Sequence, residues 1–289
     1  MLLLARMYAL AAMPELPEVE TMCRGITSIV GRRIDRVSKP VCNYRPISMI
    51  PSATAINKKL AGAKVERISR LGKRVLIHAS DHALILQPKM TGMVSLEDPP
   101  DPDHNRLQIE FKGRPKLRLL FWDRRGLGTV ELLHEDAIEE RIINGKLGPD
   151  ALAITLDVFC DKLAATSRAV KVALLDQKLL AGVGNLYASE MLHVSKIHPE
   201  KACNKLTKPK KKLLYEVMQR ILLDAIEHEG STLSDGTYRN ALNDPGSYQN
   251  QHLVYDRADE PCPSCNSGTV RRIVQAQRST FYCPKCQKK

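Results

Sequence analysis

The sequence lacks any stretch that approaches the roughly 20 consecutive apolar residues of a membrane-spanning helix, and no basic amphipathic run dominates it. These two absences disfavour a protein that spans or binds a membrane. Acidic residues are fewer than basic ones: the chain has 32 Asp and Glu and 44 Lys and Arg, which gives a formal net charge of +12 at pH 7. Such a balance indicates a polyanionic partner, because neutralising phosphates releases condensed counterions and so drives binding. We therefore expect a nucleic acid as the partner.

The chain also has no internal repeat, and its 289 residues with 43% hydrophobic content suffice for two domains that each bury a core. Four of its eight cysteines form two C-x-x-C pairs, while Cys23, Cys42, Cys160 and Cys203 are scattered. This usage favours a reducing, intracellular compartment and one metal site over a disulfide framework. The first twelve residues hold a short apolar run with a lone Arg6, too short and too weakly charged for a secretory signal.

The region from residue 65 to residue 133 alternates apolar and polar side chains in short runs, which predicts β-strands. RVLIH and ALILQ are two such runs. Residues 107–111 and 117–121 form another pair, and Gly113 and Pro115 between them predict a hairpin turn. This half of the chain is therefore expected to be mostly β.

After Gly148 and Pro149 the hydrophobic period becomes helical, so a helical second domain is expected to begin there. Helices are expected near residues 155–166, 168–179, 185–194 and 207–228. The Pro- and Asp-rich segment 98–104 predicts a loop, and the chain beyond Gly230 is again rich in loop residues.

The strongest local signal is a cysteine module near the C-terminus. Cys262-Pro-Ser-Cys265 is followed after 17 residues by Cys283-Pro-Lys-Cys286, a spacing typical of a structural zinc ribbon. Four thiolates close the coordination of one zinc ion and leave no open position for catalysis. The alternative is that these cysteines coincide by chance or form disulfides. From Cys262 to Lys289 there are six Lys or Arg and no Asp or Glu, which favours phosphate binding.

A second motif, MPELPEVET, occupies residues 13–21, and alone it is typical of the first turn of a helix. It occurs together with LLDQKLLAGVGNLYASE at residues 174–190 and QRSTFYCPKCQ at residues 277–287. These three motifs, in this order, closely resemble those of the bacterial formamidopyrimidine-DNA glycosylases. The resemblance extends from Pro14 to the C-terminus.

The resemblance implies an α+β multidomain fold, with an N-terminal β-sandwich and flanking helices, a helix-two-turn-helix element and a C-terminal zinc finger. It implies that DNA binds in a cleft between the domains. The expected boundaries are residues 14–148 for the catalytic β-sandwich domain, 149–245 for the helix-two-turn-helix domain and 246–289 for the zinc finger. Residues 1–13 are expected to be an extension or a misassigned start.

The implied activity is that of a bifunctional DNA glycosylase and abasic-site lyase. Such an enzyme removes oxidised purines, namely 8-oxoguanine and formamidopyrimidines, from duplex DNA through an N-terminal proline Schiff base and β,δ-elimination in base excision repair. The matching nucleophile is Pro14, the matching proton donor is Glu15, and Glu18 is matched too; an amine beside a carboxylic acid suits this chemistry. The resemblance further implies a monomer in the bacterial cytoplasm, associated with the nucleoid.

Several other residues match family positions that contact DNA. Lys73 in SRLGKRVLIH matches an active-site lysine; without the resemblance it would be expected at a solvated strand end. Lys171 and Asn185 match phosphate-binding residues of the helix-two-turn-helix element, where a Gly-rich turn into a helix exposes N–H groups. Arg278 matches the zinc-finger arginine that clamps phosphates around the extruded nucleotide.

Extruding a base leaves a gap in the stack, which apolar side chains and an arginine can fill. The matching residues are Met90 in KMTG and Arg125 and Leu127 in DRRGLG. This sequence departs from the commoner R-R-F-G run, with the smaller Leu127 in place of Phe. Thr237 and Tyr248 are candidates in the segment that covers the everted base.

Two alternatives stay open. Endonuclease VIII shares the zinc finger and prefers oxidised pyrimidines, but its start typically reads P-E-G-P-E, whereas this chain reads P-E-L-P-E. The other alternative is a DNA-binding module that has lost catalysis, because an internal Pro14 is a tertiary amide with no nucleophilic lone pair. Met13 directly precedes the motif, so we expect a start there, followed by removal of the Met.

Overall fold

The computed structural model describes residues 13–99, 101–232 and 238–289. These residues fall into two compact units. The first unit runs to Ile142 and also takes in Ile226–Gln249, and the second consists of Ile143–Ala225 and Asn250–Lys289. Each unit is therefore built from two segments that are far apart in the sequence. Separate folding domains with boundaries at residues 148 and 245 remain a prediction.

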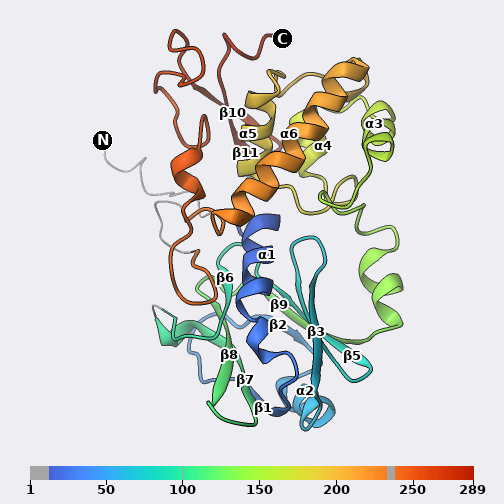
Figure 1. Ribbon diagram of the computed structural model, residues 1–289, viewed down its shortest axis with the longest axis vertical. Coiled ribbons are helices and arrows are strands. Elements are labelled where there is room, and N and C mark those ends of the chain that lie inside the picture. Colours follow the sequence, from blue (N-terminus) through green and yellow to red (C-terminus); the bar gives the residue numbers. More distant parts are fainter. Residues whose placement is uncertain (1–12, 100, 233–237) are drawn as a thin grey trace. The chain divides into compact units, whose positions relative to one another are not determined.

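The first unit holds two β-sheets, drawn as arrows in Figure 1. The four-stranded sheet has the order β1 (Ile34–Ser38), β7 (Asn105–Phe111), β8 (Leu117–Asp123), β6 (Gly92–Ser95). The five-stranded sheet has the order β2 (Ser48–Ile50), β9 (Thr129–His134), β5 (His82–Gln87), β4 (Val75–Ala79), β3 (Val65–Arg70). The named strands pair antiparallel except for β2 and β9, which are parallel.

One hydrophobic core lies between the two sheets. Fully buried side chains of both sheets belong to it, among them Leu84 from β5 and Phe121 from β8. Helix α1 (Leu16–Gly25) adds Val19 and Met22, and it packs against β3, β4 and β6, so it contacts both sheets. Helix α2 (Ala53–Leu60) packs against β1. This arrangement confirms the expected β-sandwich with flanking helices.

Most strand predictions are confirmed, and one loop prediction is wrong in part. The runs RVLIH and ALILQ coincide with β4 and β5, and the predicted hairpin is formed by β7 and β8. Within the predicted loop 98–104, however, Pro102–His104 form a 3₁₀ turn. Asp101 caps this turn by accepting a hydrogen bond from the Asp103 N–H at 2.9 Å. An aspartate cap followed by proline favours a helical start even in a short polar segment.

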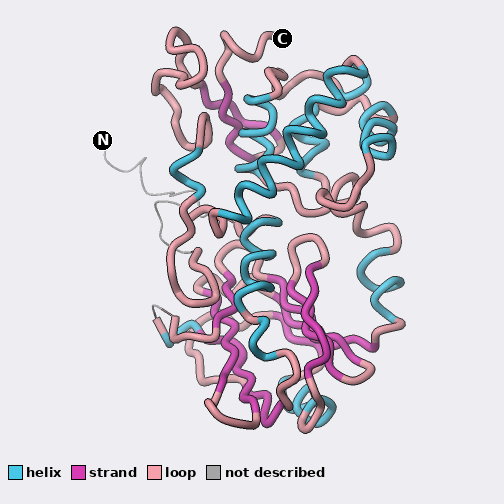
Figure 2. The backbone as a smooth tube through the Cα atoms, in the orientation of Figure 1, coloured by secondary structure: helices cyan, strands magenta, loops and turns pink. Residues whose placement is uncertain are grey.

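The regular elements of the second unit are mainly helices, drawn in cyan in Figure 2. Its helices are α3 (Leu156–Ala164), α4 (Val170–Leu175), α5 (Asn185–Val194) and most of α6 (Lys208–Glu227), which confirm the four predicted helical runs. The hairpin of β10 (Arg271–Gln275) and β11 (Arg278–Tyr282) follows, and β11 contacts α5. Within the residues that the structure describes, no helix is long and apolar enough to cross a membrane.

Candidate functional site

The motif around Pro14 forms the rigid start of α1. Pro14 and Glu15 lie directly before the helix, and both are buried, Glu15 to 4% exposure. Glu15 is the N-cap residue of a capping box, in which Glu18 Oε2 accepts the Glu15 N–H at 2.9 Å. Pro17 occupies the first turn, where its missing N–H costs no hydrogen bond. A buried carboxyl group is thereby fixed next to Pro14.

Glu18 also joins α1 to the segment that follows α6. Its second oxygen, Oε1, accepts the Ser231 N–H at 2.9 Å, and a Cβ on Gly230 would lie 2.9 Å from that oxygen. Gly230 has φ +79°, so a side chain there would be both crowded and strained. Tyr238 donates to the Glu229 carbonyl at 2.9 Å, and burial raises the pKa of its hydroxyl.

Thr237 and Tyr248 are the two candidates in the segment that is predicted to cover the everted base. Thr237 lies outside the described residues. Tyr248 is buried to 5% exposure, and its N–H donates to the Gly230 carbonyl at 3.0 Å. Tyr248 is therefore held near the beginning of this segment.

Lys73 lies in the tight turn that joins β3 to β4. Reciprocal backbone hydrogen bonds of 3.0 and 3.1 Å between Leu71 and Arg74 close this turn. Arg70 at the end of β3 forms a 3.0 Å ion pair with Glu20 of α1, which ties the turn to that helix. Lys73 is only 9% exposed, so it is not the solvated lysine that its position at a strand end would suggest.

The gap-filling candidates lie on two neighbouring loops, the Met90 loop (residues 88–92) and the Leu127 loop (residues 124–128). Met90 and Leu127 are half-buried, and Arg125 is exposed. The Met90 loop is closed by the Gly92 N–H, which donates to the Pro88 carbonyl at 2.9 Å. The structure thus brings three residues of two separate motifs to one edge of the first unit.

Asp123, at the end of β8, holds these two loops together. Its Oδ1 accepts from Thr91 Oγ1 at 2.5 Å and from the Arg125 N–H at 3.2 Å, and its Oδ2 accepts the Gly128 N–H at 2.7 Å. The carboxylate has no exposed surface. The anchor was not predicted from the sequence, although an Asp at the end of an apolar strand, just before a glycine-rich loop, was its signal.

Gly126, between Arg125 and Leu127, lies at a position where only a glycine fits without displacing its neighbours. Gly126 has φ +62°, and a Cβ at this position would lie 2.4 Å from the Arg45 carbonyl oxygen. Any larger residue would therefore displace the segment around Arg45. Glycine at this position allows the Leu127 loop to pack closely against that segment.

In the second unit, two of the three predicted phosphate-binding residues, Lys171 and Asn185, are in direct contact. Lys171 Nζ donates to the Asn185 carbonyl at 2.9 Å and to Ser189 Oγ. Asn185 Nδ2 in turn donates to the Ser279 carbonyl at 2.9 Å, which joins the start of α5 to β11. Lys171 is fully buried in this conformation, so it supports the turn before α5 and offers no surface to a phosphate.

Arg278 lies at the tip of the β10–β11 hairpin and is exposed. The two residues of the turn, Ala276 and Gln277, have φ values of 46° and 61°, as two-residue hairpin turns of type I′ require. Ser279, the next residue, accepts the bond from Asn185 described above. Arg278 is thus presented to solvent by a turn whose base is fixed to α5.

The four cysteines of the module come together as a metal-binding cluster. Their Sγ atoms all lie within 4.8 Å of one another, and the Cys262–Cys286 and Cys265–Cys283 pairs are each separated by 3.9 Å. Thiolates about 2.3 Å from a tetrahedral zinc would be roughly this far apart. A Cβ on Gly268 would lie 2.7 Å from Cys283 Sγ, so a glycine makes room for the sulfurs. The residues present fit zinc.

Glu190 of α5 is a further buried residue that the sequence analysis did not identify. Its carboxylate accepts the N–H groups of Leu253, Val254 and Tyr255 at 2.9, 3.0 and 2.7 Å. Burial raises the pKa of Glu190, and the three hydrogen bonds oppose that shift. Glu190 thereby fixes the segment that leads into the cysteine module. Its signal in the sequence was the lone acidic residue of α5, a helix of mostly apolar residues.

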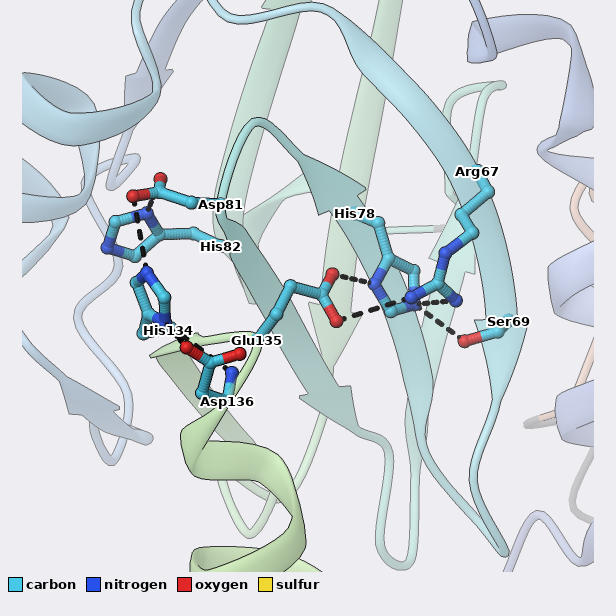
Figure 3. Close-up of polar contacts among 8 residues, drawn as sticks. All are labelled: Arg67, Ser69, His78, Asp81, His82, His134, Glu135 and Asp136. Carbon is cyan, nitrogen blue, oxygen red and sulfur yellow. Dashed lines mark hydrogen bonds and ion pairs between the residues drawn. The ribbon is translucent and has the colours of Figure 1, made fainter.

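A polar network lies on the five-stranded sheet (Figure 3). His78 Nε2 accepts from Ser69 Oγ at 2.7 Å and from Arg67 at 2.9 Å, while its Nδ1 contacts Glu135. Arginine can only donate, so Nδ1 carries the imidazole proton. The network has the order serine, histidine, carboxylate, but a guanidinium already occupies the nitrogen that would have to take the serine proton. It therefore links β3, β4 and the residue after β9 rather than activating Ser69.

Comparison with protein families gives three matches in chain order. Residues 13–130 match the formamidopyrimidine-DNA glycosylase N-terminal domain, and residues 147–237 match the formamidopyrimidine-DNA glycosylase H2TH domain. Residues 259–289 match a zinc finger found in FPG and IleRS. These matches cover well over half of the chain.

Individual proteins agree with these matches. The chain is 36% identical over 280 residues to a formamidopyrimidine-DNA glycosylase of Bacillus subtilis, covering 96% of this chain and all of that one. The corresponding Listeria monocytogenes protein is 35% identical over 283 residues, with the same coverage of both chains. A mutant Lactococcus lactis enzyme in complex with Fapy-dG-containing DNA has a TM-score of 0.84 at 33% identity, covering 96% of this chain and all of that chain. This chain therefore belongs to the formamidopyrimidine-DNA glycosylase family.

Proposed function

We propose that this protein is a bifunctional DNA glycosylase and abasic-site lyase that removes oxidised purines, namely 8-oxoguanine and formamidopyrimidines, from duplex DNA in base excision repair. It belongs to a family of repair glycosylases, and the structure of a Lactococcus lactis relative has been solved in complex with DNA that contains an abasic site. The observation that carries the proposal is the placement of Pro14 directly before the buried carboxyl group of Glu15 at the start of α1.

The proposed chemistry begins with a free secondary amine on Pro14. Its lone pair attacks C1′ of the damaged nucleotide, the bond from C1′ to the base breaks, and the departing base takes up the proton that the amine loses. Glu15 then protonates the ring oxygen as the bond from C1′ to that oxygen breaks. The product is an iminium ion that joins Pro14 to the sugar. Elimination from this iminium, first β and then δ, cuts the strand on both sides of the site. Lys73, in the buried turn tied to α1, contacts the DNA beside this reaction.

Binding is assigned to different residues from catalysis. Exposed Arg278 and partly exposed Asn185 contact phosphates, Asn185 also fixes the hairpin that carries Arg278, and Lys171 supports the turn before α5. Met90, Arg125 and Leu127 fill the gap that the extruded base leaves, because apolar and cationic groups can replace its stacking and pairing. The net charge of +12 favours association with duplex DNA. In this proposal the protein acts as a monomer in the cytoplasm, at the nucleoid.

One structural zinc ion, held by Cys262, Cys265, Cys283 and Cys286, completes the proposal. Four thiolates satisfy a tetrahedral zinc, so the metal would organise the β10–β11 hairpin and take no part in the reaction. The exposed arginines of this hairpin would then face phosphate.

The test is borohydride trapping with a chain that begins at Pro14 and duplex DNA that contains 8-oxoguanine. We expect a covalent complex with borohydride and strand cleavage without it. Glu15→Gln should lose at least about 100-fold in base removal, because a general acid contributes that much, while DNA affinity stays unchanged. Glu66→Gln, the same change at an exposed position, is the matched control.

A second arm tests the nucleophile itself. Met13→Ala in the full-length chain should retain the preceding residues and leave Pro14 as an amide, which abolishes trapping while binding persists. If that protein traps DNA as efficiently as the chain that begins at Pro14, then Pro14 is not the nucleophile, and Lys73 becomes the first candidate. If neither protein traps or cleaves but both bind, the chain is a DNA-binding module.

A further inference from the structure

Cys42 lies in the connection between β1 and β2, which is held against the start of β7. Arg106 Nη1 of β7 donates to Cys42 Sγ at 2.6 Å. Two residues further on, the ring of Tyr44 stacks on His104 with centroids 4.2 Å apart. The Arg45 carbonyl in turn packs against Gly126. The sulfur of Cys42 is therefore fixed beside a guanidinium, and Cys42 itself remains partly exposed.

Arg106 has hydrogen-bonding capacity that the protein leaves unused. Its side chain is 2% exposed, and its Nε donates to the Asp123 carbonyl at 2.8 Å. Its Nη2 is buried and has no hydrogen-bond partner among the described residues, and none of their carboxylates forms an ion pair with this guanidinium. A buried cation without a counter-charge is costly, and a buried donor without an acceptor adds to that cost. An anionic oxygen beside Arg106 Nη2 would supply both the missing counter-charge and the missing hydrogen-bond acceptor.

The other cysteines outside the metal module have different surroundings. Burial raises the pKa of Cys23 to about 12 and that of Cys203 to about 11, so both thiols are protonated and shielded. Burial also raises the pKa of Cys160, which is partly exposed and receives no hydrogen bond from any guanidinium of the described residues. Cys160 is therefore the natural comparison for Cys42.

We propose that Cys42 is a site of oxidation by hydroperoxides and that Arg106 holds the oxygen that is added. The sulfur attacks the distal oxygen of the peroxide, the S–O bond forms as the O–O bond breaks, and the thiol proton leaves with the departing water or alcohol. Sulfur loses two electrons and the peroxide gains them, so the products are a sulfenic acid and water or an alcohol. The new oxygen is the acceptor that Arg106 Nη2 lacks, and the guanidinium supplies positive charge at the reacting atom. This modification is independent of the proposed glycosylase activity.

The experiment exposes the zinc-loaded, full-length protein to limiting hydrogen peroxide together with a cyclic 1,3-diketone that traps sulfenic acids. Peptide mass spectrometry then measures the adduct at each cysteine separately. We expect adduct formation at Cys42 to be about tenfold faster than at Cys160, because positive charge beside an accessible sulfur controls thiol reactivity. Arg106→Lys, which keeps a cation but removes Nη2, should slow labelling at Cys42 about fivefold and leave Cys160 unchanged.

Two further variants test the proposal independently of Arg106→Lys. Cys42→Ser should remove the adduct without creating another. Tyr44→Leu removes the ring contact with His104 and frees the connection, so it should slow labelling at Cys42 even if Arg106→Lys does not fold. Equal labelling rates at Cys42 and Cys160 in the wild-type protein would overturn the proposal. So would an unchanged rate at Cys42 in a folded Arg106→Lys protein.

Discussion

Replacing Asp123 by Asn tests whether one buried carboxylate sets the positions of both the Met90 loop and the Leu127 loop. The two side chains have nearly the same shape, so the change removes charge and one acceptor without opening a cavity. Asp123 accepts three hydrogen bonds, from Thr91, Arg125 and Gly128. An Asn side chain has one carbonyl oxygen, so its NH₂ group must face either the Gly128 N–H or the donors of Thr91 and Arg125.

The expected magnitude follows from these contacts. A hydrogen bond to a charged acceptor contributes about 1.5 to 3 kcal/mol, and leaving a buried donor without an acceptor costs about 1 to 3 kcal/mol. Asp123→Asn loses at least one such bond, so we expect the free energy of unfolding to fall by about 3 kcal/mol. The Met90 and Leu127 loops should also lose their common anchor. In the proposed function the contacts of these loops with DNA form only after the base is extruded, so excision should slow by at least about tenfold, or ~1.4 kcal/mol.

Urea denaturation measures the first quantity, and single-turnover excision from duplex DNA measures the second. Affinity for undamaged DNA should stay within about twofold, since the proposed phosphate contacts lie elsewhere. The matched control is Asp98→Asn, the same substitution at an exposed carboxylate that pairs with Arg118, where a surface ion pair contributes only about 0 to 1 kcal/mol. Thr91→Val, which removes only the hydroxyl that links the Met90 loop to Asp123, should reproduce the slower excision with a smaller loss of stability.

Asp123 is not the anchor of these loops if the free energy of unfolding of Asp123→Asn lies within about 1 kcal/mol of the wild-type value, since a buried charged acceptor would then contribute little. Met90→Ala separates this outcome from failure of the proposed function. If Met90→Ala slows excision while Asp123→Asn and Thr91→Val do not, the loops act on the base but Asp123 does not position them. If Met90→Ala leaves excision unchanged, the gap-filling role is wrong.

Two further predictions concern the second unit. Metal analysis should find one zinc per chain, and Cys283→Ser should lose both zinc and DNA affinity because the remaining thiolates cannot close the site. Cys160→Ser is the control. A Cys283→Ser protein that keeps its zinc and still binds DNA would contradict this prediction. Burial, together with the charge of Arg257, lowers the pKa of His252 from 6.5 to about 4. The unfolded chain therefore binds a proton that the folded chain does not between these values, and stability falls as pH drops through this window, by up to ~1.4 kcal/mol per pH unit. Denaturation at stepped pH should show a shallower slope for His252→Gln, and an unchanged slope would show that the shift is absent.

Much of the fold could be predicted from local patterns. Short apolar runs located β4, β5, β7 and β8, although every residue of β4 is buried and only β7 shows clear alternation. The helical period located α3 to α6, because burying one face of a helix imposes that period on the chain. The short parallel pairing of β2 with β9 left no such trace. The sequence also gave no sign that Ile226–Gln249 belongs to the first unit. Packing between segments far apart in the chain depends on surfaces that form only when the protein folds.

The residues of the candidate site were likewise found partly from the sequence and partly only from the structure. Spacing alone predicted the four-cysteine cluster, because zinc ribbons require C-x-x-C knuckles, and the sulfurs do converge. Similarity to a family pointed to Pro14, Glu15, Lys73, Met90, Arg125, Leu127, Lys171, Asn185 and Arg278, whose roles remain predictions. The sequence could not show that Lys171 is fully buried behind Asn185, because burial of a lysine depends on what packs over it.

The sequence by itself determined β4, β5, β7 and β8, the helices α3 to α6, the four cysteine ligands and the family, since each depends on residue types at short spacings. Only the tertiary structure placed Asp123 between two loops, Glu18 between α1 and Ser231, and Arg106 against Cys42. These partners are separated by 32, 213 and 64 positions along the chain. Buried polar groups must find partners wherever the fold brings donors and acceptors together, and no local pattern encodes which distant residue that will be.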